Sequence, residues 1–192
     1  MALVTKAQIR SAAARTRLAK NNRTADAILK EEASAVRSSY DIFLSHSYLD
    51  KTDILGVKEF IEGKGHTVYV DWIDDKQLDR SKVDKSTAAQ LRAAMKKCAC
   101  LIYAYSPNIT NSRWCPWELG YFDGYNGSAF VMPIVENQSE TYGGTEYVGL
   151  YNRIEEHKSN RDTMELFAVI DRNYKYLGGL IDEARKRMSL SG

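Results

Sequence analysis

The segment best suited to chemistry is SRWCPWEL, at residues 112–119. Trp114 and Glu118 are four positions apart, so on a helix they share one face, and Pro116 suits the first turn of such a helix. A carboxylate beside indole rings can hydrogen-bond a sugar hydroxyl or stabilise an oxocarbenium-like centre. Alternatively, Glu118 compensates the dipole at the start of a helix, while Trp114 and Trp117 anchor the core. Residue types and spacing leave both interpretations open.

Two common uses of an α/β protein are excluded by the sequence. The glycines on either side of Lys64 lack the spacing of a dinucleotide fingerprint and follow an expected helix, and the chain contains no Walker-type phosphate loop. A phospho-receiver protein would need an aspartate at the end of its third strand, where this chain has YSP at residues 105–107. The glycines are therefore interpreted as a helix cap and turn.

The cysteines and two of the histidines indicate no metal or redox site. Cys98, Cys100 and Cys115 form an odd count and lack His or Cys neighbours at metal-ligand spacing, so we predict reduced thiols near a core. His66 and His157 have no motif context, and we predict that they lie at the surface. No metal is expected.

Strand and helix patterns alternate from residue 40 onwards. Strands are predicted at residues 40–46, 67–72, 99–106 and 129–135, with a fifth at either 151–155 or 166–170. Helices are predicted at residues 53–64, 83–97, 116–125 and 172–188. This order predicts a parallel sheet with helices on both faces, in which ligands bind beyond the carboxyl ends of the strands. Residues 73–82 form a charged loop longer than a usual connection, and such loops are often functional.

Charge divides the chain into two parts. Residues 1–39 hold eight of the 27 Lys and Arg but only three of the 25 Asp and Glu, so this part is +5 and the rest is −3. We predict a basic helical extension at residues 1–39, a solvated helix pair or docking arm with a break at Asn21-Asn22, and one domain at residues 40–192. The small net charge of +2 argues against nucleic-acid binding.

Nothing in the sequence indicates a membrane or a secretory route. The longest apolar runs, at residues 99–104 and 129–134, are far shorter than the ~20 residues that a membrane span needs. The first 20 residues lack a compact apolar stretch and carry five basic residues, unlike a secretory signal. We therefore expect a cytoplasmic protein.

Three motifs, in the right order, resemble the TIR (Toll/interleukin-1 receptor) family. YDIFLSH at residues 40–46 resembles the family's first box, VYVDW at 68–72 its second strand, and residues 112–119 its Ser-x-Trp-Cys-x-x-Glu-Leu signature. The resemblance covers about four-fifths of the chain and excludes residues 1–39. It implies a flavodoxin-like, doubly wound, five-stranded parallel sheet. The isolated-domain form is most similar to bacterial TIR proteins, including those of Thoeris-type anti-phage systems.

The resemblance also implies an activity. Many such TIR domains cleave the nicotinamide ribosyl bond of NAD⁺, releasing nicotinamide and ADP-ribose or a cyclic isomer that acts as an immune signal. NAD⁺ would then be the substrate, with no separate cofactor, and Glu118 the catalytic residue. The departing nicotinamide is already cationic, so one carboxylate without a metal is sufficient in principle. Substrate contacts are implied for Ser45, His46, Tyr48, Asp71, Trp72, Trp114 and Trp117.

The family resemblance further implies partners, and it leaves a second function open. In family members the loop that matches residues 73–82 packs against a neighbouring subunit, so a homo-oligomer is predicted, with a downstream effector reached through the nucleotide product. This loop departs from the family pattern at residues 78–81, LDRS, where a glycine is usual. The alternative function is a non-catalytic TIR–TIR interaction module, as in adaptors or virulence factors. The presence of Glu118 favours the enzyme.

Overall fold

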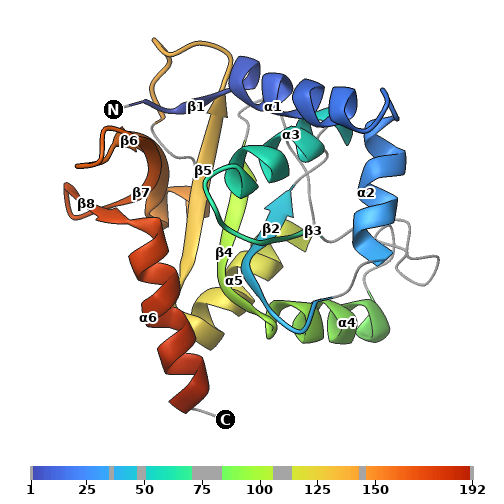
Figure 1. The fold of residues 1–192 in the computed structure, drawn as a ribbon. Coiled ribbons are helices and arrows are strands. Elements are labelled where there is room, and N and C mark those ends of the chain that lie inside the picture. The colour runs from blue at the N-terminus through green and yellow to red at the C-terminus, as the bar shows by residue number, and fades with distance from the viewer. Residues whose placement is uncertain are drawn as a thin grey trace.

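Five parallel strands form the centre of the sheet in the computed structural model, which describes residues 2–34, 37–46, 51–70, 84–105, 114–142 and 146–190 (Figure 1). Across the sheet they are β3 (Val68–Val70), β2 (Tyr40–His46), β4 (Cys98–Tyr105), β5 (Ala129–Val135) and β6 (Arg153–Lys158). Strand β2 is the first of these five along the chain. It pairs with both β3 and β4, so it lies inside the sheet rather than at its edge. This is the flavodoxin-like order, and the predicted fold class is confirmed.

The two faces of the sheet are covered by different helices. Successive strand residues point to opposite faces, so Ile42 and Phe43 of β2 belong to two separate apolar clusters. The α3/α6 face is the side of Ile42, covered by α3 (Lys51–Glu62) and α6 (Leu177–Leu190). The α4/α5 face is the side of Phe43, covered by α4 (Lys85–Met95), α5 (Trp114–Asn126) and the 3-10 helix η1 (Glu146–Leu150). No helix within the described ranges combines the length and apolar character that crossing a bilayer requires.

The sheet continues beyond the parallel strands in an antiparallel hairpin. Strand β7 (Met164–Ile170) pairs with β6, and β8 (Asn173–Tyr176) pairs with β7. The two alternatives for the fifth strand, residues 151–155 and 166–170, therefore both lie largely in strands. The prediction of a helix from residue 172 is wrong, because Asp171 and Arg172 reverse the chain with φ of 49° and 66°. Residues 173–176 then pair with β7, and α6 begins only at Leu177.

The N-terminal extension contains the predicted helix pair. Helices α1 (Lys6–Ala19) and α2 (Ala25–Ser34) are separated at Asn21 and Asn22, which both have φ of 56°. Asparagine tolerates this left-handed backbone better than most residues. Thr5 caps α1 in a reciprocal arrangement with Gln8, which satisfies two backbone groups at the helix start. The predicted break between the two helices is confirmed.

The extension also adds a strand that the sequence did not predict. Strand β1 (Val4–Thr5) runs parallel to the end of β5, pairing Val4 with Ile134. Just before it, Ala2 forms an antiparallel bridge with Glu156 of β6. Strand β1 therefore links the ends of β5 and β6.

Helix α1 packs very closely on α3 at Gly56. A Cβ atom added at Gly56 would lie 2.3 Å from the carbonyl oxygen of Ile9, so the two backbones can approach only because this residue is glycine. Ile9, Ala12 and Ala13 are buried in the same cluster as the strand residues of the α3/α6 face. The division of the chain at residue 39 stays a proposal, while the apolar side of the extension is part of the core.

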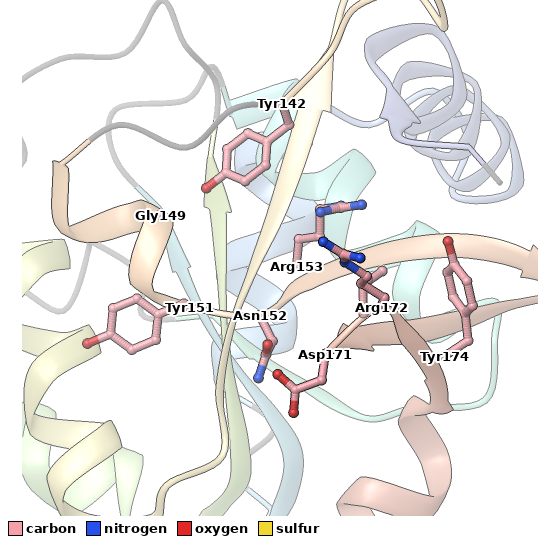
Figure 2. A pocket seen from close by; sticks show the side chains of 9 residues that line it. Tyr142, Gly149, Tyr151, Asn152, Arg153, Asp171, Arg172 and Tyr174 are labelled. Atoms are coloured by element: carbon pink, nitrogen blue, oxygen red, sulfur yellow. The ribbon is translucent and has the colours of Figure 1, made fainter.

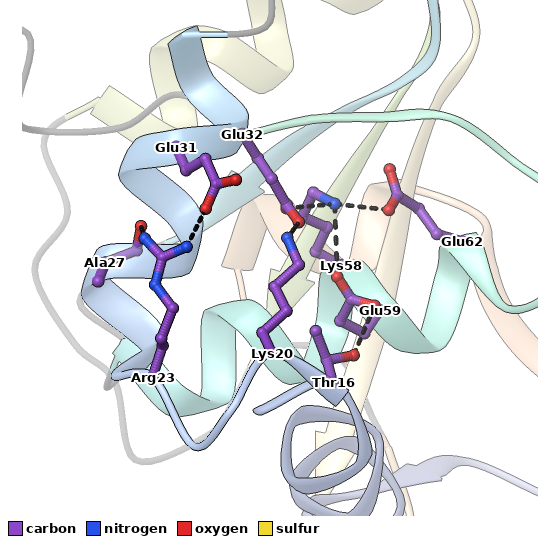
Figure 3. Close-up of polar contacts among 9 residues, drawn as sticks. All are labelled: Thr16, Lys20, Arg23, Ala27, Glu31, Glu32, Lys58, Glu59 and Glu62. Carbon is purple, nitrogen blue, oxygen red and sulfur yellow. Dashed lines mark hydrogen bonds and ion pairs between the residues drawn. The ribbon is translucent and has the colours of Figure 1, made fainter. Parts of the chain in front are cut away.

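Charged side chains complete the contact of α1 and α2 with α3 (Figure 3). Lys58 is 7% exposed, and its Nζ lies 2.8 Å from Glu32 and 2.5 Å from Glu62. The second carboxylate oxygen of Glu32 accepts a hydrogen bond from Lys20 at 2.7 Å. Burial lowers the pKa of Lys58, but its pairing with Glu32 and Glu62 raises the pKa more, so the net shift is upward. The ammonium group therefore stays charged in the interface.

Candidate active site

Glu118 lies in the second turn of α5 and faces the sheet. The residue is 0% exposed. Ser45, the last residue but one of β2, donates a hydrogen bond from its Oγ to Oε2 of Glu118 at 2.6 Å. Because Ser45 has the same parity as Phe43, it points to the α4/α5 face. The strand and the helix thus bring two predicted site residues, 73 positions apart in the chain, into direct contact.

The position of Glu118 shows which of two roles suits it better, a functional carboxylate or a residue that compensates the helix dipole. Helix α5 begins at Trp114 and has no acidic residue in its first turn, where the helix dipole mainly acts. A glutamate that only compensated the dipole would lie in that turn and contact water, whereas Glu118 lies further along and inside the protein. Burying a carboxylate costs free energy unless it is hydrogen-bonded or paired. The geometry therefore favours a functional carboxylate.

A row of tyrosines extends from Ser45 along the α4/α5 face. Tyr103 of β4 pairs in register with Ser45 and is 3% exposed. Its ring contacts Tyr105 edge to face, with centroids 5.9 Å apart, and Tyr105 contacts Tyr142 in the same way at 5.7 Å. Sequence reasoning missed these tyrosines. The signal that could have identified Tyr103 is the alternation of β4, in which Leu101 and Tyr103 share the face of Phe43 and Ser45.

The two tryptophans near Glu118 have different surroundings. Trp114 is 4% exposed and belongs to the cluster of the α4/α5 face. Glu118 is buried on the same helix, so the prediction that Trp114 and Glu118 share one helix face is confirmed. Trp117 is half-buried; its ring contacts Trp114 edge to face at 5.5 Å and stacks on Tyr121 at 5.6 Å. The guanidinium of Arg92 on α4 lies 5.9 Å from the Trp117 ring. Trp117 thus packs toward α4, and its substrate-binding role stays a prediction.

The remaining predicted site residues are only partly described. His46 is the last residue of β2 and is 3% exposed, and strand alternation directs it away from the face of Ser45. Tyr48, Asp71 and Trp72 lie outside the described residues, as does the loop at 73–82. The substrate-binding roles of all four residues stay predictions.

The thiols offer no nucleophile, and one histidine differs from its predicted position. Cys98, Cys100 and Cys115 are free and buried, so the prediction of reduced thiols near the core is confirmed. Burial raises the pKa of Cys98 and of Cys100, which keeps both thiols protonated near neutral pH. The prediction that His66 lies at the surface is wrong. It is 7% exposed, with the ring of Tyr176 6.5 Å from its own.

Comparison with known proteins gives three findings. The model of a family described as TIR domain matches residues 42–165. A Bacillus cereus protein named "probable 3′ cyclic ADP-D-ribose synthase ThsB′" is 56% identical over 113 residues, 58% of this chain and 58% of that protein. A Cytobacillus dafuensis protein named "putative cyclic ADP-D-ribose synthase TIR2" is 27% identical over 99 residues, 50% of this chain and 26% of that protein. The aligned part of the chain thus spans less than two thirds of either relative.

Proposed function

The chain belongs to the TIR domain family, and we propose that it cleaves the N-glycosidic bond between nicotinamide and ribose in NAD⁺ and closes the remaining ADP-ribose into a cyclic isomer. Both relatives are named as cyclic ADP-D-ribose synthases, and one is 56% identical over the aligned residues. The observation that carries the proposal is the pair of Glu118 and Ser45. It is a fully buried carboxylate held by a hydroxyl, inside the range that matches the family.

In the proposed reaction, the bond between the ribose C1 atom and the pyridinium nitrogen breaks. The electron pair of that bond leaves with nicotinamide, which becomes neutral, so the leaving group needs no proton. The ribose is left with oxocarbenium-like positive charge, and the carboxylate of Glu118 supplies the opposing charge in a low-dielectric interior. Ser45 acts as a positioning residue, because its 2.6 Å hydrogen bond fixes the orientation of the carboxylate.

The second step decides the product. A hydroxyl of the same nucleotide attacks the C1 atom and loses its proton, which gives a cyclic product, whereas water gives linear ADP-ribose. A hydroxyl of the bound nucleotide that is already held near the C1 atom has an advantage over water, and both relatives are named as cyclic ADP-D-ribose synthases. We therefore propose cyclisation, with the 3′ isomer named for the Bacillus cereus relative as the product. The product would act in the cytoplasm as a signal for a downstream effector.

Product analysis tests this function. Purified protein is incubated with NAD⁺, and the products are separated by liquid chromatography and identified by mass. We expect nicotinamide and a compound lighter than ADP-ribose by one water molecule. Linear ADP-ribose as the sole ribosyl product would overturn cyclisation. Intact NAD⁺ at every protein concentration would overturn the enzymatic function and favour the non-catalytic interaction module.

We also propose that the active form is a homo-oligomer built through TIR–TIR contacts. Glu118 cannot touch a substrate while it is fully buried, so substrate binding requires a rearrangement that contact with a second subunit can stabilise. Head-to-tail contacts can extend into filaments, so specific activity should rise with protein concentration. Reversing the charges of Asp74 and Asp75 should reduce activity together with assembly, measured by light scattering. Constant specific activity from nanomolar to micromolar protein, with a monomer throughout, would contradict this proposal.

A further inference from the structure

A cavity of about 490 Å³ lies beside the antiparallel end of the sheet (Figure 2). Tyr142, the far end of the tyrosine row that starts beside Ser45, is the one lining residue described above with the candidate active site. Its lining comes from the end of η1, the start of β6, and the turn between β7 and β8, together with Tyr142. It shares no residue with the predicted site, and its size falls within the range of small-molecule pockets, roughly 300–1,000 Å³. The cavity therefore needs an interpretation of its own.

Two arginines from different strand ends line this cavity. In Figure 2 the guanidinium groups of Arg153 and Arg172 reach into the same space, whereas the carboxylate of Asp171 is directed away from them. Arg153 uses its Nε atom to bind Glu155 at 2.5 Å. Its two terminal nitrogens are then the groups that can bind a phosphate. Within the described residues, Arg172 has no ion-pair partner. Two converging guanidinium groups match the geometry and charge of a phosphate.

Three tyrosines complete the lining of the cavity, namely Tyr142, Tyr151 and Tyr174. Burial raises the pKa of Tyr142 to about 12, although the positive charge of Arg153 opposes the shift. Burial also raises the pKa of Tyr151. Both phenols therefore stay protonated at neutral pH and can donate hydrogen bonds. In Figure 2 the rings of Tyr142 and Tyr174 lie on either side of the arginine pair, whereas the ring of Tyr151 is directed away from it. An aromatic ring beside an arginine pair provides a surface on which a planar base can stack.

The turn that carries Arg172 holds an unfavourable backbone conformation. Ile170 and Asn173 pair directly, so Asp171 and Arg172 form a two-residue hairpin loop, and both have positive φ. Glycine or asparagine normally occupies such positions, because a larger side chain is strained there. A glycine in place of Arg172 would relax the turn. An arginine at position 172 is thus explained by the role of its side chain rather than by the needs of the turn.

We propose that this cavity is a second ligand site that binds a nucleotide carrying a phosphate or diphosphate group, with the phosphate between Arg153 and Arg172 and the base against the tyrosines. The proposal goes beyond the cleavage of NAD⁺ and does not depend on it. Adenosine diphosphate is a suitable probe, because it has both recognised parts and no nicotinamide bond to cleave. Inorganic pyrophosphate is the matched probe without the base.

Titration calorimetry on the full chain tests the proposal with two variants. Replacing Arg172 by Gly should weaken binding of adenosine diphosphate at least ~10-fold, because a charge-assisted contact is lost, and should raise the melting temperature, because the turn relaxes. The opposite directions of these two effects exclude unfolding as the cause of lost binding. Arg153→Gln should weaken binding to a similar degree.

Arg161→Gln is the matched control, since Arg161 is an exposed arginine in the turn between β6 and β7, at the opposite end of β7 from Arg172. This variant should leave binding and melting temperature unchanged. Unchanged affinity in Arg172→Gly, or no binding of adenosine diphosphate up to millimolar concentration, would overturn the site. Pyrophosphate binding as tightly as adenosine diphosphate would overturn its assignment to a nucleotide.

Discussion

Glu156 and Glu118 are two buried glutamates on opposite faces of the sheet, and their surroundings differ. On the α3/α6 face, Glu156 is 4% exposed and bound by two side chains, the Lys64 ammonium at 2.8 Å and the Gln8 amide at 2.5 Å. On the α4/α5 face, Glu118 is 0% exposed and accepts a hydrogen bond from a neutral hydroxyl. The Lys64 ammonium pairs with the carboxylate of Glu156, and removing one partner of a buried ion pair destabilises a fold, whereas the Ser45 hydroxyl fixes the orientation of the Glu118 carboxylate. Glu156 is thus interpreted as a structural residue and Glu118 as a functional one.

The largest expected effects come from replacing each of these two glutamates by glutamine in turn. Glu118→Gln should lower NAD⁺ cleavage by at least ~10²-fold, about 2.7 kcal/mol of transition-state stabilisation, with little change in melting temperature. Glu156→Gln should do the reverse, costing ~1–3 kcal/mol of unfolding free energy because Lys64 loses the carboxylate that neutralises its charge. Turnover and thermal melting of both variants measure this. Normal turnover in a folded Glu118→Gln protein would break the comparison.

The close packing on the α3/α6 face is tested next. In Gly56→Ala, the added methyl group would overlap the Ile9 carbonyl, so α1 must move away from α3, at ~1–3 kcal/mol of unfolding free energy. The control is Gly124→Ala in α5, where a Cβ meets nothing within 4 Å and helix propensity should add up to ~1 kcal/mol. Denaturant unfolding measures both variants. If Gly56→Ala were as stable as the original chain, α1 would not be fixed on α3.

A smaller effect is expected for the residue that positions Glu118. Ser45→Ala should lower kcat about 10-fold, or ~1.4 kcal/mol, with KM nearly unchanged, because the carboxylate keeps its charge but loses its orientation. Ser128→Ala is the control, since Ser128 is equally buried but accepts its hydrogen bond from Arg187 on the α3/α6 side. Steady-state kinetics separate the two parameters. An increase in KM alone would assign Ser45 to substrate binding instead.

The smallest effect concerns acid pH at the contact of α2 with α3. Burial raises the pKa of Glu32, but the hydrogen bonds from Lys20 and Lys58 lower it more, so the net shift is downward. The resulting stability is complete above the unfolded pKa and is lost as pH falls through the folded pKa. Glu32→Gln should therefore cost up to ~1 kcal/mol near pH 7 and less below about pH 4. Melting temperatures across this range, with the exposed Glu31→Gln as control, measure the difference.

Features set by residues close together in the sequence, such as single strands, could be predicted. Contacts between residues far apart in the sequence could not. Residues 129–135 form a strand buried on both faces, so their continuous apolar run was sufficient. The mostly apolar, aromatic-rich run at residues 40–46 was sufficient as well. The β7–β8 hairpin was not predictable, because Asp171 and Arg172 lack the glycine or asparagine signal of a tight turn. The rule that ligands bind at the carboxyl ends of strands indicated the segment with Glu118, and the family resemblance implied Ser45. Their hydrogen bond needed the packing of α5 on β2.

Strand β1 has a consequence for how the chain folds during synthesis. Val4 is synthesised well before its partner Ile134, and Ala2 well before its bridge partner Glu156. Such distant contacts are slow to form, because a long loop must close first. Residues 2–5 must therefore wait unpaired until β5 and β6 have been synthesised. The order of synthesis thus makes the joining of β1 to the sheet a late step of folding.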